Sequence, residues 1–485
     1  METQRLQELA ASSGGELVHG APATLVRRVT SDSRQVRPGD LFVALRGPHH
    51  DGHSYVREAA GRCAAGVLVE AARWSGPWPG CGVVMVADSR RALGQMAAVY
   101  RQGFALPLIV VAGSNGKTTT KGLLASVFSQ GGETLASEAS FNNEIGVPLT
   151  LLRLERRHRA AILEAGTNHP GELPALLGQI RPTHGVLTSI GREHLEFFGD
   201  LDGVLAEEGS VAACLPAEGV LCVNGDAAGI AQVIARTRAA VLRVGWQGGN
   251  DWQVRSAQID DGGTTFTVRA PLSAWTGDYR IRLLGRHQAV NAALALAMSA
   301  ALGLSRSLVE SGLEACRPAA GRLQLWDFAG LRVLDDAYNA NPESMSAALA
   351  TARELDCAGR RIAVLGDMAE QGDQSAALHA EAAQEAAANG IQSLFAVGQW
   401  AAVYGQAART AGVGLVREFR RGADAAEAVS GFARTGDLVL VKASRAARLE
   451  VVVEALRERG PAGELDDRAV RDKLAGGSLA RAGFV

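Results

Sequence analysis

The sequence has few cysteines and no excess of charge of one sign. Its six cysteines are scattered along 485 residues without a C-x-x-C pair. They are Cys63, Cys81, Cys214, Cys222, Cys316 and Cys357. This usage favours buried thiols in a reducing compartment over disulfides or a structural zinc site. The formal net charge of -2, from 49 basic and 51 acidic residues, supplies no overall field for a nucleic-acid backbone or an anionic membrane, so we expect neither as a partner.

Long apolar runs are also missing. Residues 1–14 contain Glu2, Arg5 and Glu8, and they lack the apolar block of a secretion signal. The most apolar stretch, residues 289–304, is rich in alanine and includes Asn291 and Ser299. It is shorter than the roughly 20 residues that span a bilayer, and it predicts a buried helix. We therefore expect a cytoplasmic protein without membrane insertion.

The composition is that of a large globular chain, with 47% apolar and 21% charged residues. A chain of 485 residues exceeds what one hydrophobic core organises, and three domains fit best. We expect an α/β fold with a small N-terminal α/β domain (1–104), a central P-loop ATPase-like α/β sheet domain (105–318) and a C-terminal Rossmann-like, doubly wound domain (319–485). Residues from 460 onward show no clear period, which predicts a loosely packed tail.

Short β-like runs alternate with helical stretches along the chain. The predicted strands include residues 66–69, 83–86, 108–112, 161–163, 185–187, 220–223, 331–334, 362–365, 394–397 and 438–441, and the predicted helices include 91–101 and 118–129. The regular strand and helix alternation beyond residue 318 is the rhythm of a doubly wound sheet.

A glycine-rich loop lies between a predicted strand and a predicted helix. It consists of Gly113, Ser114, Asn115, Gly116, Lys117, Thr118 and Thr119. Backbone N–H groups and the helix N-terminus at such a loop can hold phosphate oxygens, with Lys117 at the β- and γ-phosphates and Thr118 at Mg²⁺. A generic Walker A motif needs glycine at position 111, where this chain has Val111. The shorter motif, together with the lack of a guanine-specifying N-K-x-D, argues against a P-loop kinase or GTPase.

Seven other segments accompany this loop in a fixed order. In chain order the eight are SDSR at 31–34 with PGDLF at 38–42, DGH at 51–53, the phosphate loop, NNEIGVP at 142–148, EAGTNHPGE at 164–172, EHLE at 193–196, DDAYNANP at 335–342 and LGDM at 365–368. No single segment decides the matter. Eight in this order make the chain resemble the Mur ligase family from about residue 30 to about residue 450.

The resemblance implies an ATP- and Mg²⁺-dependent ligase of bacterial cell-wall precursor synthesis. Within the family, the segments at 164–172 and 336–342 favour the addition of D-Ala-D-Ala to UDP-N-acetylmuramoyl-tripeptide. The reaction would pass through an acyl phosphate on the C-terminal carboxylate of the tripeptide. Because the phosphoryl group and the carboxylate are both anionic, cations must surround them for the barrier to fall. These small molecules are the implied partners, and we expect a monomer.

The resemblance also implies roles for individual residues. The implied catalytic residues are Lys117, Glu164, His194 and Arg322. The implied metal-side residues are Thr118, Glu164, His194 and Glu208. For ATP the resemblance adds His287, Asn291, Arg322, Asp336 and Asn339 to the phosphate loop. For the substrates it implies Ser31, Asp32, Ser33, Arg34, Asn142, Asn143, Thr167, Asn168, Tyr338, Asn341, Lys442, Ser444 and Arg445.

Several of these residues have a simpler interpretation that the sequence leaves open. His194 is either near the metal or a packing residue, since imidazole is an unusual Mg²⁺ ligand. His287 and Asn291 are spaced to share one helix face, but they can equally cap that helix. The segment 31–34 reads either as a uridine-nucleotide contact or as a Ser/Asp-rich turn.

The chain departs from the family pattern at two positions. Most members have a carbamylated lysine where this chain has Glu208, and we hypothesise that this carboxylate replaces the carbamate. The alternative is a solvated helix residue. The family usually has glycine where this chain has Ala443, whose β-carbon would be unfavourable if the backbone needs positive φ or approaches the substrate closely.

Two further functions stay open at this stage. One is another amide ligase of the family, such as the diaminopimelate- or lysine-adding enzyme or a folylpolyglutamate synthase. The other is a non-catalytic homologue that binds nucleotide-sugar and ATP. The joint presence of Lys117, Thr118, Glu164, His194 and Arg322 argues against the second, because mere binding does not need a metal-bridged γ-phosphate.

Overall fold

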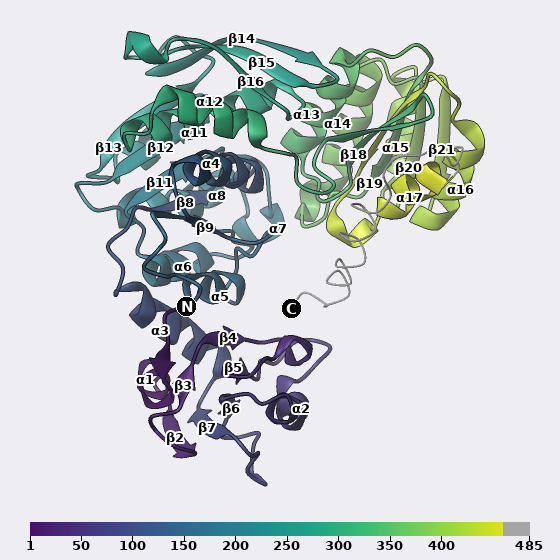
Figure 1. Cartoon of the computed structure of the whole chain (residues 1–485). Coiled ribbons are helices and arrows are strands. Elements are labelled where there is room, and N and C mark those ends of the chain that lie inside the picture. The colour runs from purple at the N-terminus through teal and green to yellow at the C-terminus, as the bar shows by residue number, and fades with distance from the viewer. Residues whose placement is uncertain (459–485) are drawn as a thin grey trace.

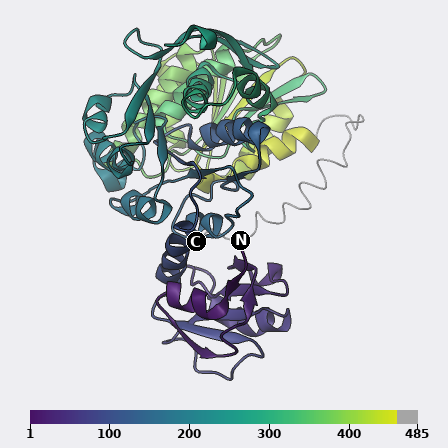
Figure 2. The same ribbon diagram turned by 60° about the vertical axis from the view of Figure 1, so that its left-hand side comes forward.

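The computed structural model describes residues 1–458, so the tail predicted from residue 460 lies outside the described residues. Three α/β domains, each built on its own β-sheet, follow one another along the chain, which confirms the predicted three-domain architecture. In Figure 1 the first sheet lies below the central one, and the third lies beside the central one. Figure 2 shows the first domain projecting from the other two. The predicted domain limits at residues 104 and 318 stay a prediction.

The first domain contains a five-stranded sheet of order β2-β7-β6-β5-β4, in which only β2 runs antiparallel to its neighbour. Its strands are β2 (Glu16–His19), β4 (Arg28–Thr30), β5 (Asp40–Val43), β6 (Gly66–Glu70) and β7 (Gly82–Val86). Strands β1 (Gln4–Arg5) and β3 (Leu25–Val26) form a separate pair. The helices are α1 (Leu6–Ser12), α2 (Val56–Gly61) and α3 (Ser89–Arg101).

Helix α3 joins the first domain to the central one. Its apolar residues Leu93 and Met96 belong to one continuous core that includes Leu68 of β6 and Leu176 of the central domain. At its end, the Tyr100 hydroxyl donates a hydrogen bond to the carbonyl of Leu154 at 2.7 Å. The first two domains therefore share a core rather than meeting at a polar surface.

The central sheet has the order β16-β15-β14-β13-β12-β11-β8-β10-β9, and its pairings are parallel except for β14–β15 and β15–β16, so β15 runs opposite to the other strands. Its strands are β8 (Leu108–Ala112), β9 (Thr134–Ala136), β10 (Ala160–Glu164), β11 (His184–Leu187), β12 (Val220–Asn224), β13 (Ala240–Gly245), β14 (Trp252–Asp260), β15 (Gly263–Arg269) and β16 (Gly277–Ile281). The helices are α4 (Lys117–Gly131), α5 (Gly146–Leu151), α6 (Glu172–Ile180), α7 (Leu195–Phe198), α8 (Leu201–Glu208), α9 (Ser210–Cys214), α10 (Ile230–Ile234), α11 (Arg286–Ala301) and α12 (Arg306–Ala315). The predicted buried helix is α11, in which every residue from 288 to 299 is buried.

The third sheet has the order β17-β18-β22-β19-β20-β21, with only β17 antiparallel. Its strands are β17 (Gln324–Phe328), β18 (Leu331–Asp336), β19 (Arg361–Gly366), β20 (Ser393–Val397), β21 (Leu415–Phe419) and β22 (Leu438–Lys442). Helices α13 (Pro342–Glu354), α14 (Ser375–Ala388) and α15 (Ala401–Thr410) share a core with one face, and α16 (Gly422–Phe432) and α17 (Glu450–Glu458) share a core with the other. Helices on both faces make this domain doubly wound, as predicted.

The cysteine side chains differ in their burial. The prediction of buried thiols is correct for Cys222 and Cys316, but it is wrong for Cys63 and Cys214, which are exposed. Cys63 lies just past the end of α2, and Cys214 is the last residue of α9.

Within residues 1–458, no helix combines the length and the apolar character needed to span a bilayer.

Candidate active site

One cleft of about 2220 Å³ lies where the three domains meet, and residues from all three line it. Most of the predicted site residues line this cleft. They are Ser31, Asp32, Ser33, Arg34, Ser114, Asn115, Gly116, Lys117, Thr118, Thr119, Asn142, Asn143, Glu164, Thr167, Asn168, His194, His287, Asn291, Arg322, Asp336, Tyr338, Asn339, Asn341, Lys442 and Arg445. Gly113, Glu208 and Ser444 are not among its lining residues.

The glycine-rich loop connects β8 to α4 and forms the floor of the cleft. Gly113 and Gly116 have φ values of 118° and 86°, a conformation that glycine adopts without strain. A β-carbon at Gly116 would lie 2.6 Å from Oδ1 of Asn291 on α11. The loop therefore has its glycines where the backbone turns left-handed and where α11 packs directly against it. Helix α4 begins at Lys117, so its free N–H groups face the cleft.

Lys117 is folded back onto its own loop. Its Nζ donates hydrogen bonds to the carbonyls of Gly113 at 2.6 Å and Ser114 at 3.2 Å, and it lies 3.6 Å from Oε2 of Glu193. Burial by itself lowers the pKa of Lys117, but the carboxylates of Glu193, Glu208 and Glu164 raise it above its usual value. The lysine is therefore held as a cation at the start of α4.

Glu164, at the end of β10, accepts a hydrogen bond from the hydroxyl of Thr118, the residue after Lys117. Thr118 Oγ1 donates a hydrogen bond to Glu164 Oε1 at 3.1 Å, and Asn142 Nδ2 donates to the same oxygen at 2.9 Å. The other carboxylate oxygen, Oε2, lies 3.4 Å from Lys121 Nζ but accepts no hydrogen bond. Asn142, predicted as a substrate residue, thus contacts the carboxylate that the sequence assigns to the metal.

Glu208 is buried at the end of α8, with 1% of its surface exposed. Its Oε2 accepts a hydrogen bond from the N–H of Gly113 at 2.7 Å, while Oε1 has no hydrogen-bond partner among residues 1–458. Burial raises the pKa of this carboxyl to about 8, against the attraction of Lys117. The alternative of a solvated helix residue is wrong, because α8 packs this face onto the phosphate loop.

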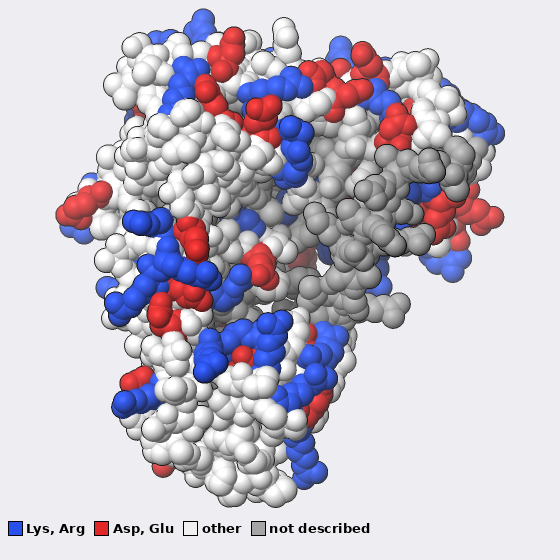
Figure 3. Space-filling model, in the orientation of Figure 1, with Lys and Arg blue, Asp and Glu red and all other residues white. Residues whose placement is uncertain are grey.

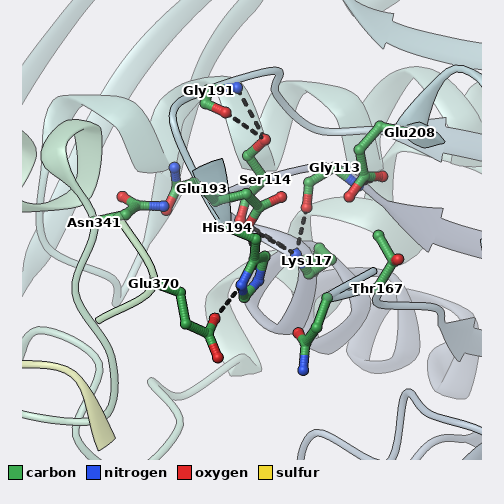
Figure 4. A network of polar contacts seen from close by, with 12 residues as sticks. Gly113, Ser114, Lys117, Thr167, Gly191, Glu193, His194, Glu208, Asn341 and Glu370 are labelled. Carbon is green, nitrogen blue, oxygen red and sulfur yellow. Dashed lines mark hydrogen bonds and ion pairs between the residues drawn. The ribbon is translucent and has the colours of Figure 1, made fainter. Parts of the chain in front are cut away.

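His194 lies on the cleft side of the loop after β11. Its Nδ1 forms a hydrogen bond with Oε2 of Glu370 from the third domain, and its Nε2 lies 3.9 Å from Oε2 of Glu193. Figure 4 shows the imidazole between Glu370 and the Lys117 region. The histidine is therefore placed beside the phosphate loop rather than in the apolar core.

His287 and Asn291 lie on the first turns of α11. The N-cap residue of α11 is Gly285, and no side-chain hydrogen bond caps this end of the helix among the described residues, so the structure does not support the capping alternative. Burial, with a smaller contribution from Lys442, lowers the pKa of His287 to about 4, which leaves the imidazole neutral at pH 7. Asn291 donates a hydrogen bond to Gln288 at 2.8 Å and faces Gly116.

In the first domain, the segment 31–34 is the turn that the simpler interpretation described. Asp32 caps a short 3-10 helix (Ser33–Gln35) by accepting the N–H of Arg34, and it also pairs with the guanidinium of Arg34 at 2.9 Å. Ser33 donates a hydrogen bond to Glu58 at 3.1 Å. The turn also lines the cleft, and its contact with a uridine nucleotide stays a prediction. Figure 3 shows Lys and Arg gathered where the first domain meets the central one.

On the loop after β10, Thr167 is buried and donates hydrogen bonds to Glu207 at 3.2 Å and to the carbonyl of His169 at 2.9 Å. Glu207 also accepts the N–H groups of Gly171 and Leu173. This carboxylate therefore fixes the loop that presents Asn168 to the cleft.

In the third domain, Lys442 is buried and paired with Asp336 at 2.5 Å, and it also donates to the carbonyl of Asn339 at 2.9 Å. The guanidinium of Arg322 lies over the ring of Tyr338 at 4.3 Å, and that of Arg445 lies 6.0 Å from the same ring. Arg322, Arg445 and Arg457 therefore line the cleft from this domain, as does Lys442, whose charge is paired with that of Asp336.

Asn341, Ser444 and Ala443 each have a structural role in the third domain, and Asn341 also lines the cleft. Asn341 caps α13 by accepting the N–H of Ser344 at 2.9 Å. Ser444 is buried away from the cleft, where its hydroxyl donates to the carbonyl of Ala340 at 3.2 Å and accepts the N–H of Ala369 at 2.8 Å. Ala443 has no positive φ, and its methyl group packs in the apolar core. The concern about a strained β-carbon at Ala443 is therefore unfounded.

Glu193, Lys121 and Glu370 contact predicted site residues but were not themselves predicted. Glu193 lies directly before His194 in the segment EHLE, so the sequence held a signal for its position. Lys121 lies one helical turn after Lys117. Glu370 is 176 residues from His194, and no local pattern links them.

Three family profiles match the chain in order. They are the Mur ligase family catalytic domain (residues 25–101), the Mur ligase middle domain (111–299) and the Mur ligase glutamate ligase domain (321–445).

Named relatives extend this similarity over nearly the whole chain. The UDP-N-acetylmuramoyl-tripeptide--D-alanyl-D-alanine ligase of Escherichia coli (strain K12) is 35% identical over 468 residues, covering 94% of this chain and 98% of that protein. The enzyme of the same name from Bacillus subtilis (strain 168) is 32% identical, covering 90% and 94%. The crystal structure of MurF from Acinetobacter baumannii is 29% identical with a TM-score of 0.84, covering 94% of this chain and 99% of that one. Together with the phosphate loop, these matches show that the chain belongs to the Mur ligase family.

Proposed function

We propose that this protein is the ATP-dependent ligase that joins D-Ala-D-Ala to UDP-N-acetylmuramoyl-tripeptide in peptidoglycan synthesis. The observation that carries the proposal is the single cleft in which a phosphate loop meets predicted substrate residues from both flanking domains. The names of the relatives support the same activity, at identities of 32% and 35% over 90% or more of the chain. Other amide ligases of the family, and a non-catalytic homologue, are less favoured.

The residues around Lys117 fit a divalent cation. Three buried carboxylates each have an oxygen that accepts no hydrogen bond, namely Oε2 of Glu164, Oε1 of Glu193 and Oε1 of Glu208. Such oxygens are costly unless a cation or water satisfies them. Within residues 1–458, no group of three His, Cys, Asp or Glu side chains forms a metal cage by itself. This suits Mg²⁺, which binds few protein ligands and keeps water and phosphate oxygens.

Thr118, Glu164, His194 and Glu208 would hold the metal, directly or through water. Bound Mg²⁺ would neutralise charge on the γ-phosphate and the substrate carboxylate. In this scheme Glu208 replaces the carbamylated lysine of most family members, because it places a carboxyl group at the phosphate loop, and a bound cation would favour the ionised form of that group. Activity should then not depend on bicarbonate.

The phosphate loop and Lys117 would bind the triphosphate of ATP. Asn291, which faces the loop from α11, and His287, Asp336 and Asn339 would bind its nucleoside. Arg322 would act from the third domain, since it lines the same cleft as the phosphate loop. An arginine contributed by a separate domain would complete the site when the domains are docked, and docking would exclude water.

The first step would transfer the γ-phosphoryl group to the terminal carboxylate of the tripeptide. A carboxylate oxygen forms a bond to phosphorus while the bond to the β-phosphate oxygen breaks, giving ADP and the acyl phosphate. The amine of D-Ala-D-Ala then attacks the acyl carbon, the amine loses a proton, and inorganic phosphate leaves. Lys117 and Arg322 would stabilise negative charge in the first step, and Arg445 would bind the carboxylate of the dipeptide.

Measurement of phosphate release tests the proposal. The purified protein is incubated with ATP, Mg²⁺ and D-Ala-D-Ala, together with UDP-muramoyl-tripeptide, UDP-muramoyl-dipeptide or UDP-muramoyl-alanine. We expect release only with the tripeptide. A Lys117→Ala variant should lose at least about a hundredfold in turnover, while Arg409→Ala, which removes an exposed cation of α15, should retain it. Equal activity of Lys117→Ala and the unmodified protein would exclude the proposal.

A further inference from the structure

The loop 191–195 is held by the third domain on both sides of Glu193. Arg192 donates hydrogen bonds from its backbone N–H at 3.1 Å and from Nε at 2.8 Å to Glu343, and from both Nη atoms to Glu381 at 3.0 and 3.2 Å. Beyond His194, the N–H of Glu196 donates to the carbonyl of Glu370 at 3.1 Å. Glu193, between these contacts, faces Lys117. The third domain thus fixes a loop that belongs to the phosphate site of the central domain.

The side chains of His194 and Glu370 meet across this interface. Both residues have left-handed backbones, with φ values of 51° and 60°. For residues other than glycine this conformation costs about 1 kcal/mol or more, and it persists only where surrounding contacts enforce it. Because an ionised carboxylate only accepts hydrogen bonds, the proton of the neutral imidazole lies on Nδ1. Nε2 is then an unprotonated nitrogen on the side of Glu193 and Lys117.

The residues on either side of Glu370 are held by hydrogen bonds within their own domain. It lies in the loop after β19, where the N–H of Met368 donates to His379 Nε2 at 2.9 Å and the N–H of Ala369 donates to Ser444 Oγ at 2.8 Å. Gln371 Nε2 donates to the carbonyl of Ala369 at 3.0 Å. The loop is therefore a preformed support for the carboxylate.

We propose that Glu370 is a positioning residue of the ligase, which fixes the tautomer and ring orientation of His194 from the third domain. A carboxylate behind a metal-side histidine commonly sets which ring nitrogen is available. Because the partner belongs to another domain, Nε2 faces the phosphate site in a defined orientation only while the third domain is docked. The expected effect on catalysis rests on the proposed function, whereas the expected tautomer of His194 does not.

Kinetics of matched variants test the catalytic part. In Glu370→Ala we expect kcat to fall about tenfold to a hundredfold, with the KM for D-Ala-D-Ala nearly unchanged, since Glu370 contacts no predicted dipeptide residue. Glu370→Gln keeps an oxygen that can accept a hydrogen bond from the Nδ1–H group of His194, so this variant should retain most of the activity. Asp373→Ala, an exposed carboxylate three residues further on, is the control. In a His194→Gln background, the additional Glu370→Ala change should have no further effect. Full turnover of Glu370→Ala would overturn the proposal.

Nitrogen NMR of histidine-labelled, metal-free protein tests the structural part. The signals of His194 are identified by their loss in His194→Gln. We expect a single Nδ1-protonated tautomer in the unmodified protein and in Glu370→Gln, and a shift toward the Nε2-protonated form in Glu370→Ala. Unchanged signals in Glu370→Ala would also overturn the proposal. If the unmodified protein does not use the tripeptide, the proposed function fails, while the spectra still decide the role of Glu370.

Discussion

At the scale of single residues, the site is defined by charges that are buried together. Lys117 is the cation among three carboxylates that reach it from β10, from the loop after β11 and from α8. The sequence could predict Lys117, Glu164 and His194, because each lies in a recognisable segment. It could not decide whether Glu208 is solvated or buried, since that depends on how α8 packs on the loop. It also could not show that Lys442 forms an ion pair with Asp336.

Removal of Glu208 should impair catalysis without unfolding the protein. Glu208→Ala deletes the acceptor of the Gly113 N–H and one proposed metal-side oxygen, so we expect turnover to fall at least about tenfold. Bicarbonate should not restore it. Asp202→Ala, on the exposed face of the same helix, should behave like the unmodified protein. The measurement is phosphate release with and without added bicarbonate, and unchanged turnover of Glu208→Ala would contradict the assignment.

Asp335 should make stability depend on pH. Burial, aided by Asp336 and Glu450, raises the pKa of Asp335 to about 6 from its ordinary 3.8. The folded state therefore binds the proton more tightly than the unfolded state, and this contribution is lost as pH rises through about 6. Asp335→Asn should stabilise the protein by about 1 kcal/mol at pH 7.5, with a smaller gain at pH 5.

Denaturant unfolding at the two pH values checks this prediction. The amide oxygen of asparagine can still accept the N–H of Ala337, as Oδ1 of Asp335 does. Asp356→Asn, at an exposed position, is the control and should show no such pH-dependent gain. A gain of equal size at both pH values would show that charge burial is not the cause.

At the scale of elements, apolar runs and glycines predicted most of the fold. The buried strands β8 and β22 begin with four consecutive Val, Ile or Leu residues, and β10 and β19 are also largely apolar, which is why the sequence predicted them. The antiparallel β14, β15 and β16 were missed, because exposed polar residues interrupt their pattern. Helix limits were predicted within a few residues, as for α3 and α4.

The turn into α4 should tolerate no side chain at Gly116. Gly116→Ala combines a left-handed φ with a β-carbon 2.6 Å from Asn291 Oδ1, so we expect a loss of about 1 to 2 kcal/mol in stability. Because the displaced backbone is the proposed phosphate site, ATP should also stabilise the variant less than it stabilises the unmodified protein.

The other end of the same helix offers the control. A β-carbon at Gly131 would meet nothing within 4 Å, so Gly131→Ala should be neutral or slightly stabilising, in line with helix propensity. Thermal unfolding with and without ATP and Mg²⁺ compares the two variants. Equal midpoints for both would show that Asn291 does not constrain the loop.

At the scale of the whole molecule, ion pairs connect the central and third domains. Arg192 bridges to Glu343 and Glu381, and Arg332 pairs with Asp261. Such pairs are too distant in sequence to be predicted from local patterns. The shape of the cleft depends on how the domains dock, so for the same reason it could not be predicted from the sequence.

Loss of the Arg192 bridge should open the cleft. In Arg192→Ala we expect a larger radius of gyration in solution scattering and a KM for D-Ala-D-Ala raised by about threefold to tenfold, because docking must then be driven by substrate. Arg280→Ala removes an ion pair between β16 and β14, within the central domain, and should change neither quantity. An unchanged radius together with an unchanged KM would show that Arg192 does not control docking.

The core that α3 shares with two sheets constrains how this molecule can be recombined with its relatives. A chimera cut near residue 104 would bring a foreign α3 against the native α5 and α6, so mismatched side chains would meet in a sealed interior. A cut before Ser89, at the start of α3, would move the mismatch to the other face of the same helix. Exchange of the first domain therefore requires that α3 and both of its contact surfaces be inherited together.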